Sequence, residues 1–146
     1  MNLSLLASGG LGLQLLKYIF SFNKIDLVAT DKDSLDIIQF AKTNDIPCFI
    51  GVPRSGKLKK ILGNSKRDTL LSINYLFLIE GDVINSYKYA INLHGSLLPK
   101  YRGRTPHVWS IINNEKVTGV TAHLIDQGCD TGDIILQKKV SIEEND

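Results

Sequence analysis

The densest run of residues that could carry chemistry lies at positions 92–103 of this 146-residue chain. Asn92 and His94 stand two residues apart in a segment expected to be a strand, so both side chains project from the same face. An amide with two N–H groups and a protonated imidazole can together stabilise negative charge that develops on an oxygen atom. This spacing predicts an oxyanion-stabilising pair at the end of a strand.

Such a pair needs a carboxylate that orients the histidine and receives a proton. The glycine-rich segment 126–133 supplies three candidates, which are Asp126, Asp130 and Asp133. Taken by residue type alone, two alternatives stay open. His94 could be a structural histidine at a strand end, and the segment could be an ordinary turn or a weak cation site.

Alternating apolar segments and turns indicate the elements that position these residues. Strands are predicted at 3–7, 25–30, 47–50, 70–75, 89–93, 118–125 and 134–140. Helices are predicted directly after the glycine turn at 8–12, and at 33–44, within 54–67, and at 82–86 and 106–113. This order favours an α/β fold, a three-layer sandwich with a mainly parallel, Rossmann-like sheet. In such sheets, ligands bind beyond the carboxyl ends of the strands.

Composition favours an ordinary globular protein. Hydrophobic residues make up 43% and charged residues 22%, and the net charge of +2 requires no polyanionic partner. Cys48 and Cys129 do not make a disulfide framework, which favours a cytoplasmic protein. The N-terminus lacks the pattern of a signal peptide, and the apolar stretch 70–79 is shorter than the ~18 residues of a membrane span. One domain over residues 1–146 is expected, without a membrane association.

The turn after the first predicted strand contains Ser8, Gly9 and Gly10, and Gly12 follows. With Asp31 further along, it forms part of a dinucleotide-binding pattern, but the third glycine is missing. Three alternatives remain: a plain strand-to-helix turn, an anion site at the helix N-terminus, and an intact dinucleotide site.

Two separated motifs together resemble the folate-dependent formyltransferase family. The first is Asn-Leu-His-Gly-Ser-Leu-Leu-Pro-Lys-Tyr-Arg-Gly at 92–103, with Gly-Val-Thr-Ala-His at 119–123 beyond it; the second spaces aspartates and glycines alternately over 126–132. The similarity covers residues 70–140, about half of the chain. It implies 10-formyltetrahydrofolate as the formyl donor, a primary amine as the acceptor and no metal. It also implies a catalytic trio of Asn92, His94 and Asp130.

The same resemblance implies two binding regions. The folate would contact backbone groups of the loop after the fourth strand and two further residues, namely Tyr75, Leu76, Phe77, Leu78, Ile79, His123 and Asp126. The acceptor would contact the glycine turn and the segment after His94, namely Ser8, Gly9, Gly10, Lys100, Arg102 and Gly103. Asp126 is the alternative to Asp130 as the catalytic carboxylate.

The acceptor is expected to be a nucleotide-linked amino sugar, since residues 102–109 resemble that branch of the family most closely. Enzymes similar to methionyl-tRNA or glycinamide ribonucleotide formyltransferases are the alternatives. The basic segment 54–67 could contact nucleic acid, but a solvated helix face is the preferred interpretation, so nucleic acid is not expected as a partner. A non-catalytic folate- or nucleotide-binding domain is the alternative from another class. Members of the family usually continue past the last strand into a further helix, so this chain is expected to be short at its C-terminus relative to the family. A homodimer could cover the sheet face that this helix would otherwise cover.

Overall fold

The computed structural model describes residues 2–146 and divides into two compact units, Met1–Ala90 and Ile91–Asp146. The strands follow the order β3-β2-β1-β4-β5-β6-β7. Strand β5 (Tyr87–His94) runs through the boundary between the units. Each unit is described separately below.

The first unit is a parallel α/β unit. Strand β1 pairs in parallel with β2 and β4, and β2 pairs in parallel with β3. Its strands are β1 (Leu3–Ala7), β2 (Leu27–Thr30), β3 (Cys48–Ile50), β4 (Arg67–Ile73) and the first half of β5. Its helices are α1 (Gly9–Phe20), α2 (Leu35–Thr43), α3 (Lys57–Leu62) and α4 (Gly81–Ile84).

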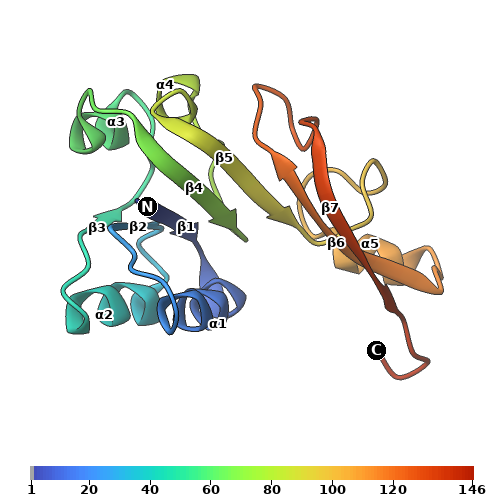
Figure 1. The fold of residues 1–146 in the computed structure, drawn as a ribbon. Helices are drawn as coiled ribbons and strands as arrows, with labels where there is room; N and C mark the ends of the chain where they lie inside the picture. The colour runs from blue at the N-terminus through green and yellow to red at the C-terminus, as the bar shows by residue number, and fades with distance from the viewer. Residues whose placement is uncertain (1) are drawn as a thin grey trace. The chain divides into compact units, whose positions relative to one another are not determined.

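Burial explains why these segments form a layered unit. All five residues of β1 and all four of β2 are buried, as expected for strands covered on both faces. Figure 1 shows α1 and α2 on one side of these strands and α3 and α4 on the other. Gly12 lets α1 approach β1 closely, because a Cβ at this position would lie 3.1 Å from the Ala7 Cβ.

The second unit is antiparallel. It contains the end of β5, helix α5 (Pro106–Ile112) and strands β6 (Val117–Leu124) and β7 (Ile134–Ser141). Strand β6 pairs antiparallel with β5 on one side and with β7 on the other (Figure 1). Every residue of β7 is exposed. Pro106 occupies the first turn of α5, where its missing N–H costs no hydrogen bond.

The predicted α/β fold with a mainly parallel sheet is confirmed, with shifted boundaries. The fourth strand starts at Arg67 rather than residue 70 and ends at Ile73, which leaves Tyr75 in the following loop. The helix in the basic segment spans only Lys57–Leu62, because Gly63 takes a positive φ of 69° and ends it. Within residues 2–146, no helix is long and apolar enough to cross a membrane.

Candidate active site

The catalytic residues expected from the sequence meet in the second unit. Asn92 and His94 project from β5, and Asp130 lies in the loop between β6 and β7. The Asp130 carboxylate joins the other two: Oδ1 accepts from Asn92 Nδ2 at 3.3 Å, and Oδ2 lies 3.5 Å from His94 Nδ1. These side chains are largely shielded, with 6% of His94 and 13% of Asp130 exposed, so their charges interact with little screening.

Each ring nitrogen of His94 faces an oxygen atom that can accept a hydrogen bond. Its Nε2 lies 2.8 Å from the carbonyl oxygen of Tyr101, while Nδ1 faces Asp130. A carbonyl oxygen only accepts, so Nε2 is the donor in this hydrogen bond. The Tyr101 carbonyl and the Asp130 carboxylate therefore lie against opposite nitrogens of the His94 ring.

His123 is a fourth member of this network. It is 2% exposed and lies on β6 directly opposite Asn92 in the antiparallel register. Its Nδ1 lies 2.8 Å from the carbonyl oxygen of Leu124 and must donate there. The Nε2 of His123 then accepts from Asn92 Nδ2 at 3.2 Å, and it lies 3.5 Å from Asp130 Oδ1.

The donors that were expected to hold an oxyanion therefore already have partners. The amide of Asn92 donates to His123 and Asp130, and the Nε2–H of His94 donates to Tyr101. Donation from Asn92 to a substrate oxygen competes with these two acceptors.

The loop that carries Asp130 is built by close backbone contacts. Asp130 has a positive φ of 53°, and its Oδ2 accepts from the backbone N–H of Gly103 at 2.8 Å. A Cβ at Gly132 would overlap the carbonyl of Leu124, so only glycine fits where the loop returns to β6. Gly103 contributes its N–H to the carboxylate, and its expected contact with the acceptor stays a prediction.

Asp126 organises the same loop from its exposed side. Its Oδ1 accepts from Thr131 Oγ1 at 2.7 Å and from the Gly128 N–H at 2.9 Å. The hydroxyl of Thr131 is the main reason why the pKa of Asp126 lies below its ordinary value. These contacts join residues of the loop and do not reach His94, which favours Asp130 over Asp126 as the partner of the histidine.

The remaining expected acceptor residues of this unit are exposed. Lys100 Nζ donates to Glu115 Oε1 at 2.9 Å, and the side chain of Arg102 lies on the surface. Tyr101, which sequence analysis did not assign to the site, contributes through its backbone carbonyl. No sequence signal identifies a main-chain acceptor, since every residue carries one.

The expected folate loop lies in the first unit. Residues 75–79 have no regular structure, and their exposure alternates. Leu76 and Leu78 are exposed, whereas Tyr75 packs edge-on against Phe77 with ring centroids 5.4 Å apart. Burial raises the pKa of the Tyr75 phenol well above its ordinary value, so it stays neutral. The expectation that residues 75–79 contact the folate through their backbone stays a prediction.

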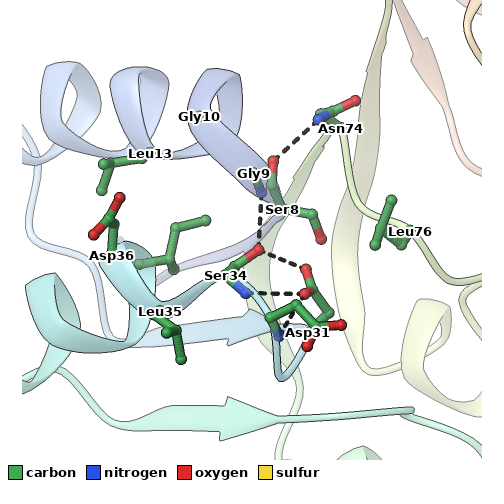
Figure 2. A pocket seen from close by; sticks show the side chains of 12 residues that line it. Ser8, Gly9, Gly10, Leu13, Asp31, Ser34, Leu35, Asp36, Asn74 and Leu76 are labelled. Atoms are coloured by element: carbon green, nitrogen blue, oxygen red, sulfur yellow. Dashed lines mark hydrogen bonds between the residues drawn. The ribbon is translucent and has the colours of Figure 1, made fainter.

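Ser8, Gly9 and Gly10 line a pocket of about 530 Å³ in the first unit (Figure 2). The N–H of Gly9 donates to Ser34 Oγ at 2.9 Å, and that hydroxyl donates to Asp31 Oδ2 at 2.6 Å. Burial alone would raise the pKa of Asp31, but hydrogen bonds from Ser34 and the Asp33 N–H outweigh it and keep the group ionised. Three aspartates, Asp31, Asp33 and Asp36, line the pocket without a lysine or arginine.

This acidic lining disfavours a free phosphate in the pocket, which was one expectation for the glycine turn. Across residues 2–146, no group of three or more His, Cys, Asp or Glu side chains is arranged to hold a metal ion.

Comparison with known proteins gives several formyltransferases among the relatives of this chain. A methionyl-tRNA formyltransferase of Pelotomaculum thermopropionicum is 40% identical over 110 residues, which are 74% of this chain and 35% of that protein. A GDP-perosamine N-formyltransferase of Brucella melitensis biotype 1 is 44% identical over 84 residues, 57% of this chain and 32% of that protein. The chain thus spans about a third of the length of these curated relatives.

Solved structures agree with this similarity. A phosphoribosylglycinamide formyltransferase from Bacillus halodurans superposes with a TM-score of 0.80 at 30% identity, covering 100% of this chain and 82% of that one. WlaRD, a sugar 3N-formyl transferase solved in the presence of dTDP and 5-N-formyl-THF, gives a TM-score of 0.74 at 27% identity, covering 98% and 53%. The family model described as formyl transferase matches residues 20–146. The chain therefore belongs to the formyl transferase family.

Proposed function

We propose that this protein transfers a formyl group from 10-formyltetrahydrofolate to a primary amine. The observation that carries the proposal is the network in which Asp130 contacts both Asn92 and His94. The amine nitrogen attacks the formyl carbon and a C–N bond forms. The bond from that carbon to N10 of the folate then breaks, the amine loses a proton, and N10 gains one.

The proposal gives each member of the trio a role that is consistent with its contacts. His94 is proposed to stabilise the oxyanion electrostatically, and its two ring nitrogens face the Tyr101 carbonyl and the Asp130 carboxylate. Asn92 donates to the oxyanion after exchanging the longer of its two contacts, the 3.3 Å one to Asp130. Asp130, released from that contact, accepts the proton of the amine, directly or through water. Residues 75–79, His123 and Asp126 are proposed to bind the folate.

The proposed acceptor is a nucleotide-linked amino sugar. The GDP-perosamine N-formyltransferase relative and the likeness to WlaRD support this class. Lys100 and Arg102 are exposed cations suited to its phosphates. Ser8, Gly9 and Gly10 are proposed to contact its hydroxyl groups, because the neighbouring aspartates accept hydrogen bonds from hydroxyls and repel phosphate.

The direct test incubates the protein with 10-formyltetrahydrofolate and a GDP- or dTDP-linked 4-amino-4,6-dideoxy sugar, and follows tetrahydrofolate release. Asn92→Ala and His94→Ala should abolish release while the circular dichroism spectrum stays unchanged. Absence of release with any amine would refute the proposal. Folate binding without turnover would favour the non-catalytic alternative.

A second candidate acceptor is methionyl-tRNA, supported by the 40% identity to the Pelotomaculum enzyme. Part of the basic segment that could bind RNA has other partners, since Arg67 pairs with Asp26 at 2.8 Å and Lys59 donates to Ser86. Steeply salt-dependent tRNA binding together with formylation of the charged tRNA would favour this acceptor over the amino sugar.

A further inference from the structure

Tyr101 holds His94 through a backbone conformation that needs support. Its φ is +56°, in the left-handed region that residues with a side chain rarely occupy. In this conformation the carbonyl of Tyr101 accepts from His94 Nε2 at 2.8 Å. A conformation of this kind persists only where the surrounding structure holds it.

The side chain of Tyr101 is held at its far end by Glu115. The phenol hydroxyl donates to Glu115 Oε1 at 2.8 Å, and Lys100 Nζ donates to the same oxygen at 2.9 Å. The backbone of Glu115 is itself fixed, because its N–H donates to the carbonyl of Ser110 in α5 at 3.0 Å. The hydrogen bond to Glu115 therefore restrains the position of the Tyr101 ring.

The charge states of Glu115 and Tyr101 favour this hydrogen bond. Hydrogen bonds from Lys100 and then Tyr101 hold the pKa of Glu115 below its ordinary value, and the hydrogen bond to Glu115 raises the pKa of Tyr101. Around neutral pH the pair is thus a carboxylate that accepts from a neutral phenol. Charge-assisted hydrogen bonds of this type are among the stronger ones in proteins.

We propose that Glu115 is a positioning residue for His94 and acts through Tyr101. When Glu115 is present, the Tyr101 carbonyl keeps its hydrogen bond with His94 Nε2. This contact orients His94 Nδ1 towards Asp130, 3.5 Å away. Without the hydrogen bond to Glu115 the Tyr101 backbone relaxes out of the left-handed region and its carbonyl turns away from the imidazole. The consequence for catalysis rests on the proposed formyl transfer, whereas the consequence for the imidazole does not.

The first experiment measures formyl transfer in the full chain. Glu115→Ala and Tyr101→Phe should each lower kcat by about tenfold to a hundredfold while KM changes less, since the orientation of one catalytic group is lost. The kcat of the double variant should be no lower than that of either single variant, because both substitutions break the same hydrogen bond. Glu115→Gln should restore most of the rate, because its amide oxygen still accepts from the phenol. Glu144→Ala, at an exposed glutamate near the end of the chain, is the matched control.

The second experiment needs no activity. The ring ¹⁵N resonances of His94 should move in Glu115→Ala and in Tyr101→Phe, return towards the wild-type position in Glu115→Gln, and stay in place in Glu144→Ala. Unmoved resonances in the first two variants would overturn the inference, as would additive losses in the double variant. If the resonances move as expected but the wild-type chain forms no product, the proposed function fails while the positioning role stands. Tyr101→Phe removes a single oxygen atom and serves if Glu115→Ala does not fold.

Discussion

Asn92 on β5 donates to Nε2 of His123, 3.2 Å away on β6, at directly paired positions of the two strands. His123 can accept there because its other nitrogen donates to the carbonyl of Leu124. The amide nitrogen of Asn92 thus lies within hydrogen-bond distance of both His123 and Asp130. This order of donors and acceptors has consequences that can be measured.

Replacing His123 should disturb Asn92. His123→Leu replaces the acceptor with an apolar side chain at a position that is 2% exposed. We expect formyl transfer to fall by about tenfold or more, since the amide loses its fixed orientation. Gln39→Leu, at an exposed position of α2, is the control and should stay near the wild-type rate. Equal rates for the two variants would contradict the role of His123.

Asn92→Asp keeps the shape of the side chain but replaces a donor with a carboxylate. The new group would stand about 3.3 Å from Asp130 Oδ1, so the two carboxylates would repel one another or share a proton. We expect a loss of about 10²–10³ in kcat, the usual effect of removing one oxyanion donor. The assay is tetrahydrofolate release, with thermal unfolding to show that the chain is folded. A rate close to that of the wild type would mean that the amide donors are not needed.

Cys129 reports on the charge of Asp130 without an activity assay. Partial burial and then the Asp130 carboxylate, 3.6 Å away, raise the pKa of the Cys129 thiol, so little thiolate is present at neutral pH. In a Cys48→Ser background, iodoacetamide should modify Cys129 more slowly than a simple thiol. Asp130→Asn should speed the reaction, because removal of the negative charge lowers the pKa. Unchanged alkylation would show that the carboxylate does not act on the sulfur.

Asp126 should make the stability of the chain depend on pH at its acid end. Its pKa is lowered in the folded state, so its ionised form stabilises the fold above the unfolded pKa, and this stabilisation is lost as the pH falls through the folded pKa. Asp126→Asn should therefore be less stable than the wild type at about pH 7, and the difference should shrink below about pH 4. Urea unfolding at several pH values measures this. A difference that does not change with pH would contradict the assignment.

Much of the fold follows from local patterns. The apolar runs at 3–7 and 25–30 contain strands β1 and β2, whose residues are buried. Gly12 in α1 lets this helix lie close to β1. Boundaries were less predictable where a polar residue continues a strand, as at Arg67, whose side chain pairs with Asp26 in a neighbouring segment. That pairing depends on which strands become neighbours, and local sequence does not contain it.

By itself, the sequence determined that Asn92 and His94 share one face of a strand, because side chains alternate along any strand. It also pointed to the aspartate loop, through the spacing of its carboxylates and glycines. Only the tertiary structure decided that His123 accepts from Asn92, that Tyr101 holds His94 by its carbonyl, and that Gly103 donates to Asp130. These contacts depend on the register of antiparallel strands and on main-chain groups that all residues share, so residue types alone cannot specify them.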